Sequence, residues 1–177
     1  MLINTYMSNN DGMEKLERFA LVDNDKQIYR GSQPNKLHIQ LLKSMGIKTI
    51  INLRKEEPIQ RIKERRRCEK HGIKYIGFPF FGIYGFDEKF VNSVVDAMYN
   101  TNEPIYIHCL HGRDRTSVMC ASYLVKYHKK DPESAWKEDV LEYDHDETDK
   151  YNAKFKESFF EFCRSLNQMG FDQVRHE

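Results

Sequence analysis

Three short runs of β-branched and aromatic residues alternate along the chain with segments of helical spacing. The runs are Lys48–Leu53, Ile73–Phe78 and Pro104–Cys109, and their nearly continuous apolar character predicts strands that are covered on both faces. This alternation predicts an α/β fold whose central, mainly parallel sheet is flanked by helices. Ligands of such sheets bind at the carboxyl ends of the strands, so a site is expected directly after one of these runs.

Apolar residues at helical spacing predict the helices around these strands. The stripes are Leu37, Leu41, Leu42 and Met45, ended by Gly46; Val91, Val94, Val95 and Met98; Val118, Ala121 and Val125; and Phe155, Phe159, Phe162 and Leu166. Pro58 sits where a first-turn proline opens a polar helix, which Gly72 ends. Asp131 and Pro132 similarly predict the start of a helix that carries Trp136.

Length and charge limit the kind of protein. A chain of 177 residues suits one domain over 1–177, with an N-terminal extension over 1–25 and a C-terminal helix within 146–177 that packs on the domain. With 28 basic and 27 acidic residues, the net charge is +1, which argues against a nucleic-acid binder that works through bulk charge. No apolar run approaches the roughly 18 residues that span a bilayer, and residues 1–20 lack a signal peptide's apolar stretch. We therefore expect a cytoplasmic protein without a transmembrane segment.

The cysteines do not outline a disulfide framework or a zinc site. Cys68, Cys109, Cys120 and Cys163 form no CxxC pair and are irregularly spaced. His108 and His111 beside Cys109 are too few to complete a tetrahedral metal site. We expect reduced thiols and neither a metal nor another cofactor.

The loop after the third run carries the chemistry. It reads His108-Cys109-Leu110-His111-Gly112-Arg113-Asp114-Arg115-Thr116, that is, a cysteine, five residues and an arginine. A glycine-bent loop that opens a helix points its backbone N–H groups inward and favours phosphate, and the same field stabilises a cysteine thiolate. Arg115 can hold two phosphate oxygens, and Thr116 can donate a hydrogen bond to the Cys109 sulfur. These groups predict nucleophilic displacement through a phosphocysteine.

These residues resemble the HCxxGxxRT signature of the cysteine-dependent phosphatases, the protein tyrosine and dual-specificity superfamily. The matching residues are His108, Cys109, Gly112, Arg115 and Thr116. Upstream, Tyr29–Pro34 and Met45–Arg54 resemble the opening of small atypical dual-specificity phosphatases, and the charged loop is similar to that of phytase-like, inositol-phosphate-directed relatives. Ser117 departs from the family's usual glycine, and there is no Trp-Pro-Asp acid motif.

On its residues alone, the loop is also compatible with three different roles. Cys109 could be a buried structural thiol, the commonest fate of a free cysteine. A rhodanese-like sulfurtransferase also places a cysteine in an anion-binding loop, and a phosphate-binding module could have lost turnover.

Two aspartates are candidates for the general acid that protonates the leaving oxygen. Asp87 follows the second strand, in a loop that Gly82 and Gly85 would let move; it could instead cap the next helix. Asp114 precedes Arg115 and resembles the aspartate of the Asp-Arg pair in myotubularin and Sac-type phosphatases. It could instead be a carboxylate favoured by the helix dipole.

Cations around the loop bear on the substrate. His111 and Arg113 lie inside the loop, Arg54 and Lys55 follow the first strand, and the loop's Leu110 completes the predicted binding residues with His108 and Gly112. Such density suits a substrate with several phosphates, an inositol polyphosphate or a phosphoinositide head group. The rival is a phosphoprotein, with Phe80, Phe81 and Tyr84 walling a slot for phosphotyrosine. The sequence leaves the oligomeric state open.

The near-zero net charge averages over two contrasting segments. Arg54–Lys74 contains nine Lys or Arg against four Asp or Glu, whereas Asp131–Asp149 contains one Lys against nine acidic residues. Both could be solvated helix faces. The basic segment, with Arg65, Arg66 and Arg67, could instead steer an anionic substrate toward the loop.

Overall fold

The computed structural model describes residues 15–55, 57–80, 84–150 and 152–174, the last six through their backbone alone. Its sheet has five strands in the order β1-β2-β5-β3-β4. The strands are β1 (Ala20–Asp23), β2 (Ile28–Gly31), β3 (Thr49–Arg54), β4 (Lys74–Phe80) and β5 (Ile105–His108). β1 is antiparallel to β2, and all other neighbours are parallel. The predicted mainly parallel α/β fold is confirmed.

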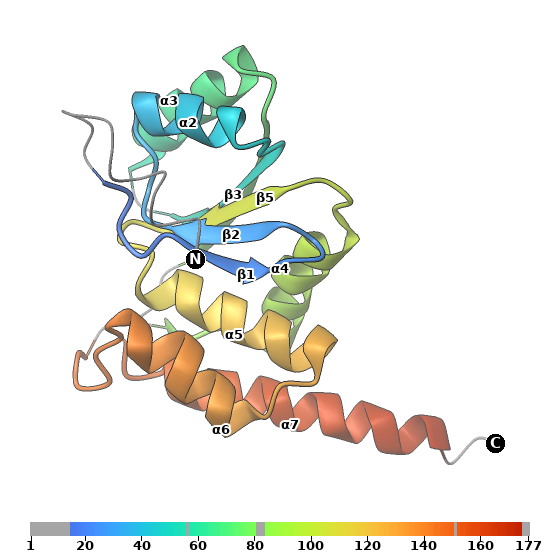
Figure 1. The fold of residues 1–177 in the computed structure, drawn as a ribbon. Coiled ribbons are helices and arrows are strands. Elements are labelled where there is room, and N and C mark those ends of the chain that lie inside the picture. Colours follow the sequence, from blue (N-terminus) through green and yellow to red (C-terminus); the bar gives the residue numbers. More distant parts are fainter. Residues whose placement is uncertain (1–14, 56, 81–83, 151, 175–177) are drawn as a thin grey trace.

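Helices cover both faces of this sheet (Figure 1). They are α2 (Lys36–Ser44), α3 (Pro58–Lys70), α4 (Glu88–Asn100), α5 (Asp114–His128), α6 (Pro132–Ala135) and α7 (Phe155–Val174). Between α6 and α7, a π-helical turn η2 (Trp136–Val140) and a 3-10 turn η3 (Leu141–Tyr143) complete the path. α2 and α3 lie on one face, and the later helices lie on the other.

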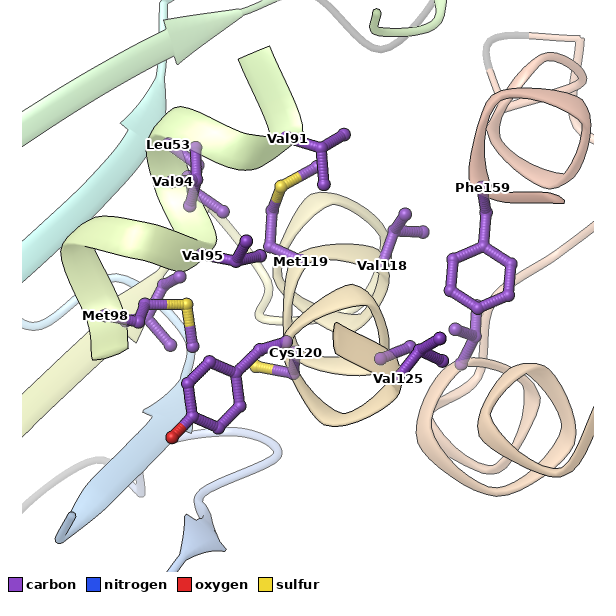
Figure 2. Close-up of a cluster of buried hydrophobic side chains, with 14 of the residues drawn as sticks. Leu53, Val91, Val94, Val95, Met98, Val118, Met119, Cys120, Val125 and Phe159 are labelled. Atoms are coloured by element: carbon purple, nitrogen blue, oxygen red, sulfur yellow. The ribbon is translucent and has the colours of Figure 1, made fainter. Parts of the chain in front are cut away.

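Two apolar cores result from the alternation of side chains along the central strands. Ile50 and Tyr106 point toward α2 and α3, where they form a small core. Ile51 and Ile107 point the other way, into a much larger core made with α4, α5 and α7. Figure 2 shows this larger core, with the valines of α4 facing α5 and Phe159 of α7 approaching α5 from its other side.

Several helix predictions agree with the structure. Asp87 and Asp131 cap α4 and α6 by accepting hydrogen bonds from Phe90 N and Ser134 N. Pro58 occupies the first turn of α3. The predicted stripes of α4 and α7 are buried or pack against the larger core.

The stripe predicted for α2 is confirmed at Leu42 but wrong at Leu37. Leu37 is 50% exposed, whereas His38, Ile39 and Leu42 are buried. The reason is the capping box that starts the helix: Asn35 accepts from His38 N, and His38 Nδ1 accepts from Asn35 N. This arrangement holds the histidine side chain inward and turns Leu37 outward.

The strands also depart from the prediction at both edges of the sheet. β4 lies at one edge and is largely half-exposed, so it is not covered on both faces. The hairpin of β1 and β2 was not predicted, because it contains Asp23 and Arg30, charged residues that are both buried here.

The chain ends relate to this fold in different ways. Residues 1–14 of the predicted extension lie outside the described part, but Leu16 is buried and β1 joins the sheet, so the segment from Leu16 onward belongs to the folded unit. Phe155, Phe159 and Phe162 of α7 are buried in the larger core. No helix in the described ranges is long and apolar enough to cross a membrane.

Candidate active site

The loop from Cys109 to Arg113 follows β5, the central strand of the sheet, and leads into α5. Cys109 is 3% exposed. Gly112 bends the loop at φ +67°, and a Cβ placed there would lie 2.4 Å from the Gly31 carbonyl carbon. Both the backbone angle and this close approach require glycine. The predicted bend at Gly112 is therefore confirmed, and its cause is contact with the end of β2.

The segment after β2 and the residue Arg18 before β1 hold the first half of the loop. Gln33 N donates to Leu110 O at 3.0 Å, and Arg18 Nη1 donates to His111 O at 3.0 Å. The segment Tyr29–Pro34, which carries part of the family resemblance, thus supports the loop from the side.

Arg30 braces the second half of the loop from beneath. Its Nη2 donates to Gly112 O and to Ser117 Oγ, both at 2.6 Å, and its guanidinium lies 3.6 Å from the centre of the Tyr143 ring. Nη1 donates to Asp139 O at 3.2 Å. The sequence prediction missed Arg30 because buried arginines are rare. Ser117, where the family usually has glycine, accepts one of these bonds.

His108 links the nucleophile's backbone to a buried carboxylate. Its Nδ1 lies 2.9 Å from Cys109 O, and its Nε2 lies 2.8 Å from Glu64 Oε1. Both nitrogens face acceptor oxygens. His108, predicted among the binding residues, is fully buried and supports the loop through its bond to the Cys109 carbonyl. Glu64 was missed because it lies in the charged run of α3, where a solvated side chain is the usual expectation.

Glu64 is fully supported within the small core. Besides His108, it accepts from Gln33 Nε2 at 2.7 Å and from Asn52 Nδ2 at 3.3 Å. Burial alone would raise the pKa of Glu64, but the charge and hydrogen bond of His108 outweigh burial and lower it. The carboxylate is therefore ionised beside the loop.

Arg54 ends β3 at the rim of the site. Its side chain is 4% exposed, Nη1 donates to Gln33 Oε1, and Nη2 donates to Glu57 Oε1 at 3.2 Å. Lys55, the next residue, is exposed. Of the two predicted cations at this strand end, only Arg54 faces the cavity described below.

A cavity of about 450 Å³ opens beside the loop between β2, α2 and α3. Its lining includes three cations, Lys15, Arg54 and Arg67, and the imidazoles of His38 and His111, together with the carboxylates of Glu17 and Glu57 and several neutral residues. Leu110 also lines it, so the structure brings Arg54, Leu110 and His111 together as predicted binding residues.

Asp114, the first residue of α5, is tied to three partners. Oδ1 accepts from Asn152 Nδ2 at 3.1 Å and pairs with His145 Nδ1 at 2.9 Å, and Oδ2 pairs with Arg113 Nε at 3.1 Å. Burial would raise the pKa of Asp114, but the His145 hydrogen bond and the Arg113 charge outweigh it and lower the pKa. The Arg113 side chain therefore points toward Asp114, and 32% of it is exposed. His145 and Asn152 carried no sequence signal.

Asp87 lies on a different side of the site. It is exposed and accepts from Phe90 N at 2.7 Å as the cap of α4. It lines a second cavity of about 570 Å³, whose wall also contains Phe80 and Tyr84. The predicted residues Phe81 and Gly82 of this loop lie outside the described part of the chain.

The remaining predicted residues sit in the first turn of α5. Arg115 Nη1 donates to Phe80 O at 3.2 Å, which links the phosphate loop to the end of β4 and the second cavity. The Thr116 hydroxyl is buried and has no hydrogen-bond partner in the described ranges. The predicted donation from Thr116 to the Cys109 sulfur is therefore not present in this structure.

The other cysteines and the metal-ligand residues add no second centre. Cys68, Cys120 and Cys163 are buried free thiols, and burial raises the pKa of each to about 12. Across the residues that the structure describes, no three His, Cys, Asp or Glu side chains are grouped as a metal site.

Several solved structures share this fold. TpbA of P. aeruginosa matches with a TM-score of 0.64 and 18% identity, covering 80% of this chain and 87% of that chain. PTPMT1 in complex with PI(5)P matches with a TM-score of 0.66 and 16% identity, covering 86% and 98%. The core catalytic domain of the PP-IP phosphatase SIW14 from S. cerevisiae matches with a TM-score of 0.59 and 21% identity, covering 81% and 94%.

Sequence comparison points in the same direction. A candidate tyrosine phosphatase, 197R of Invertebrate iridescent virus 6, is 29% identical over 129 residues, which are 66% of this chain. The chain spans less than half, 46%, of that relative's own length. The model of the tyrosine phosphatase family matches residues 15–159, from before β1 into α7 and across the whole phosphate loop. The chain therefore belongs to the tyrosine phosphatase family.

Proposed function

We propose that this protein is a cysteine-dependent phosphatase that acts on substrates with several phosphates, namely phosphorylated inositols or phosphoinositides. The observation that supports the proposal is the cavity of about 450 Å³ beside the loop, which Lys15, Arg54 and Arg67 line together with the loop residues Leu110 and His111. Each further phosphate of such a substrate can meet an Arg or Lys side chain. The Arg54 guanidinium donates to Gln33 and pairs with Glu57, so its position is fixed before the substrate binds.

The reaction proceeds in two displacements at Cys109. The thiolate attacks phosphorus, an S–P bond forms and the ester P–O bond breaks, while Arg115 and the loop N–H groups hold the phosphoryl oxygens. The leaving oxygen takes a proton from a general acid. Water then attacks the phosphocysteine, gives its proton to the same carboxylate and releases phosphate. Arg30 and His108 hold the loop in shape throughout, because both bond its backbone.

We assign the general acid to Asp87. Both carboxylate oxygens of Asp114 are already engaged, by Asn152 and His145 at Oδ1 and by Arg113 at Oδ2, so neither is free to face a leaving group. Asp87 is exposed, and its cavity shares Phe80 with Arg115, whose side chain bonds the Phe80 carbonyl. Capping α4 through one oxygen leaves the other oxygen of Asp87 available for proton transfer.

A phosphoprotein substrate is the second candidate. The cavity of Asp87 is walled by Phe80, Tyr84, Phe86 and Phe90, which would suit a phosphotyrosine ring. Glu157 and Glu161 line the same cavity and oppose a phosphate there. Solved structures of this fold hold PI(5)P in one case and pTyr in another, so likeness of fold is compatible with both. The family match leaves the sulfurtransferase alternative without support.

A substrate panel tests the proposal. Phosphate release should be measured on inositol polyphosphates, phosphoinositides and phosphotyrosine peptides, with Cys109→Ser as the inactive control. We expect kcat/KM to be at least about tenfold higher for the inositol compounds, and Arg67→Gln to raise KM for them while leaving an aryl monophosphate unaffected. Preference for phosphotyrosine peptides, or an Arg67 effect shared equally by the aryl monophosphate, would overturn it.

A further inference from the structure

Exposed apolar side chains occur on the two helices that border the cavity and on the phosphate loop itself. Six large apolar residues are strongly exposed among the described residues: Leu37, Ile59, Ile62, Tyr84, Tyr99 and Leu110. Leu110 lines the cavity, and Leu37 and Ile59 directly precede the lining residues His38 and Gln60. Ile62 follows Ile59 by about one turn of α3. One of the six thus lines the cavity, and three lie on the exposed sides of α2 and α3, the two helices that border it.

The outer face of α3 combines these isoleucines with cations. The helix buries Glu64 and Cys68. At about 100° per residue, the opposite face carries two isoleucines, 67% and 51% exposed, and three basic residues. We call this the α3 outer face: Ile59, Ile62, Lys63, Arg66 and Lys70. A surface helix normally turns its apolar residues toward the core, so the exposed isoleucines of α3 reverse the usual pattern.

Charge is distributed unevenly across the sheet. The basic segment Arg54–Lys74, nine Lys or Arg against four Asp or Glu, contains α3. The acidic segment Asp131–Asp149, one Lys against nine, contains α6 and the turns after it. Figure 1 shows α3 and α6 on opposite sides of the sheet. A negatively charged surface would thus attract the α3 side and repel the other.

We propose that the α3 outer face, with Leu37, docks on a membrane containing anionic lipids, so that the cavity receives a phosphoinositide head group from that membrane. The proposal rests on the proposed function and narrows its substrate to the lipid-borne form. Apolar side chains that enter the headgroup region, flanked by Lys and Arg, are what an interfacial helix requires. An acidic protein partner would account for the cations, but not for two isoleucines exposed among them.

Vesicle binding tests the docking surface. The full chain should be sedimented with vesicles of phosphatidylcholine alone and of phosphatidylcholine with about a quarter phosphatidylserine. We expect binding only to the second. The double variant Ile59→Ser, Ile62→Ser should weaken this binding at least about tenfold. The double variant Lys63→Gln, Lys70→Gln should also weaken it at least about tenfold, since each cation contributes about fivefold. Lys89→Gln with Lys137→Gln, exposed cations elsewhere, should leave it unchanged.

Kinetics separate this proposal from the proposed function. In the isoleucine variant, KM for phosphoinositide in vesicles should rise at least about tenfold, while kcat/KM for a soluble short-chain phosphoinositide stays within about twofold of wild type. Vesicle binding that is absent or unaffected by the isoleucine changes overturns the docking proposal, with the phosphatase assignment intact if the soluble substrate is hydrolysed. A loss confined to acidic phosphopeptides would identify a protein as the partner and equally overturn it. Failure to hydrolyse any inositol compound would instead sink the proposed function.

Discussion

Two histidine–carboxylate pairs brace the phosphate loop from opposite ends. His108 and Glu64 meet at 2.8 Å below the start of the loop, and His145 and Asp114 meet at 2.9 Å where the loop becomes α5. The first pair is fully buried, and both ring nitrogens of its histidine have partners. In the second pair, Nε2 of His145 is buried without a partner in the described ranges, and the Asp114 side chain is 18% exposed.

The difference indicates how firmly each end of the loop is held. Removing one partner of a saturated buried pair leaves a charge or polar group that water cannot reach, whereas the second pair can redistribute its bonds to Arg113 and Asn152. The two pairs share one property: the pKa of the carboxyl is lowered in each. The carboxylate oxygens of both pairs also have partners already, which favours a general acid outside both pairs.

The largest expected effect tests that conclusion at Asp87 and Asp114. With an alkyl phosphate, whose leaving group needs a proton, Asp87→Asn should lower kcat about 10²–10⁴-fold. Asp114→Asn should lower it less than about tenfold, since its role is to hold His145 and Arg113. With an activated aryl phosphate, both variants should stay near wild type. Steady-state kinetics with the two substrates provides the measurement.

The Asp87 substitution carries its own control for folding. Asparagine caps helices about as well as aspartate, so α4 should keep its start and the free energy of unfolding should change little. If Asp114→Asn instead shows the selective loss with the alkyl phosphate, the second pair takes part in proton transfer, and the assignment to Asp87 is wrong.

The next largest effect concerns the saturated pair. Glu64→Gln should lower the free energy of unfolding by about 1–3 kcal/mol at neutral pH, because a buried charge-assisted bond to His108 is lost. Urea unfolding measures the change. Glu69→Gln, an exposed glutamate of the same helix, is the matched control and should have almost no effect.

The pH dependence of this variant follows from the direction of the Glu64 shift. The pKa in the folded chain is lower than the ordinary value of 4.5, so the stability due to the ionised group is fully present above 4.5 and is lost as the pH falls through the folded value. The deficit of Glu64→Gln relative to wild type should therefore shrink below pH 4.5. A deficit that is constant from neutral to acid pH would show that packing, and not charge, holds Glu64.

The sequence could predict the fold and the phosphate loop because both depend on residues that lie close together along the chain. Strand–helix alternation fixes the α/β class, and the run from His108 to Thr116 lies on consecutive residues. The supports behind the loop could not be predicted. Arg30, Glu64 and His145 lie 82, 44 and 31 positions along the chain from Gly112, His108 and Asp114, the residues that they contact.

These supports share a physical property that conceals them in a sequence. Each is a polar or charged residue that is buried by tertiary contacts, against the usual preference for exposure. Glu64 shows the difficulty most clearly: it is one of many charged residues in α3, and only the three-dimensional path of β3 and β5 selects it as the buried one. The exposed isoleucines of α3 are the opposite case, since apolar spacing alone would have turned them inward.

The smallest expected effect concerns the second pair. His145→Phe should lower the free energy of unfolding by only about 1 kcal/mol, because one hydrogen bond to Asp114 is lost while an unpartnered buried nitrogen is removed as well. Phenylalanine can keep the ring contacts with Trp136 and Phe155, and Asp114 keeps Arg113 and Asn152. Urea unfolding beside Glu64→Gln gives the comparison. A loss as large as that of Glu64→Gln would show that the two ends of the loop are held equally firmly, and that the unpaired nitrogen of His145 is no sign of a weaker brace.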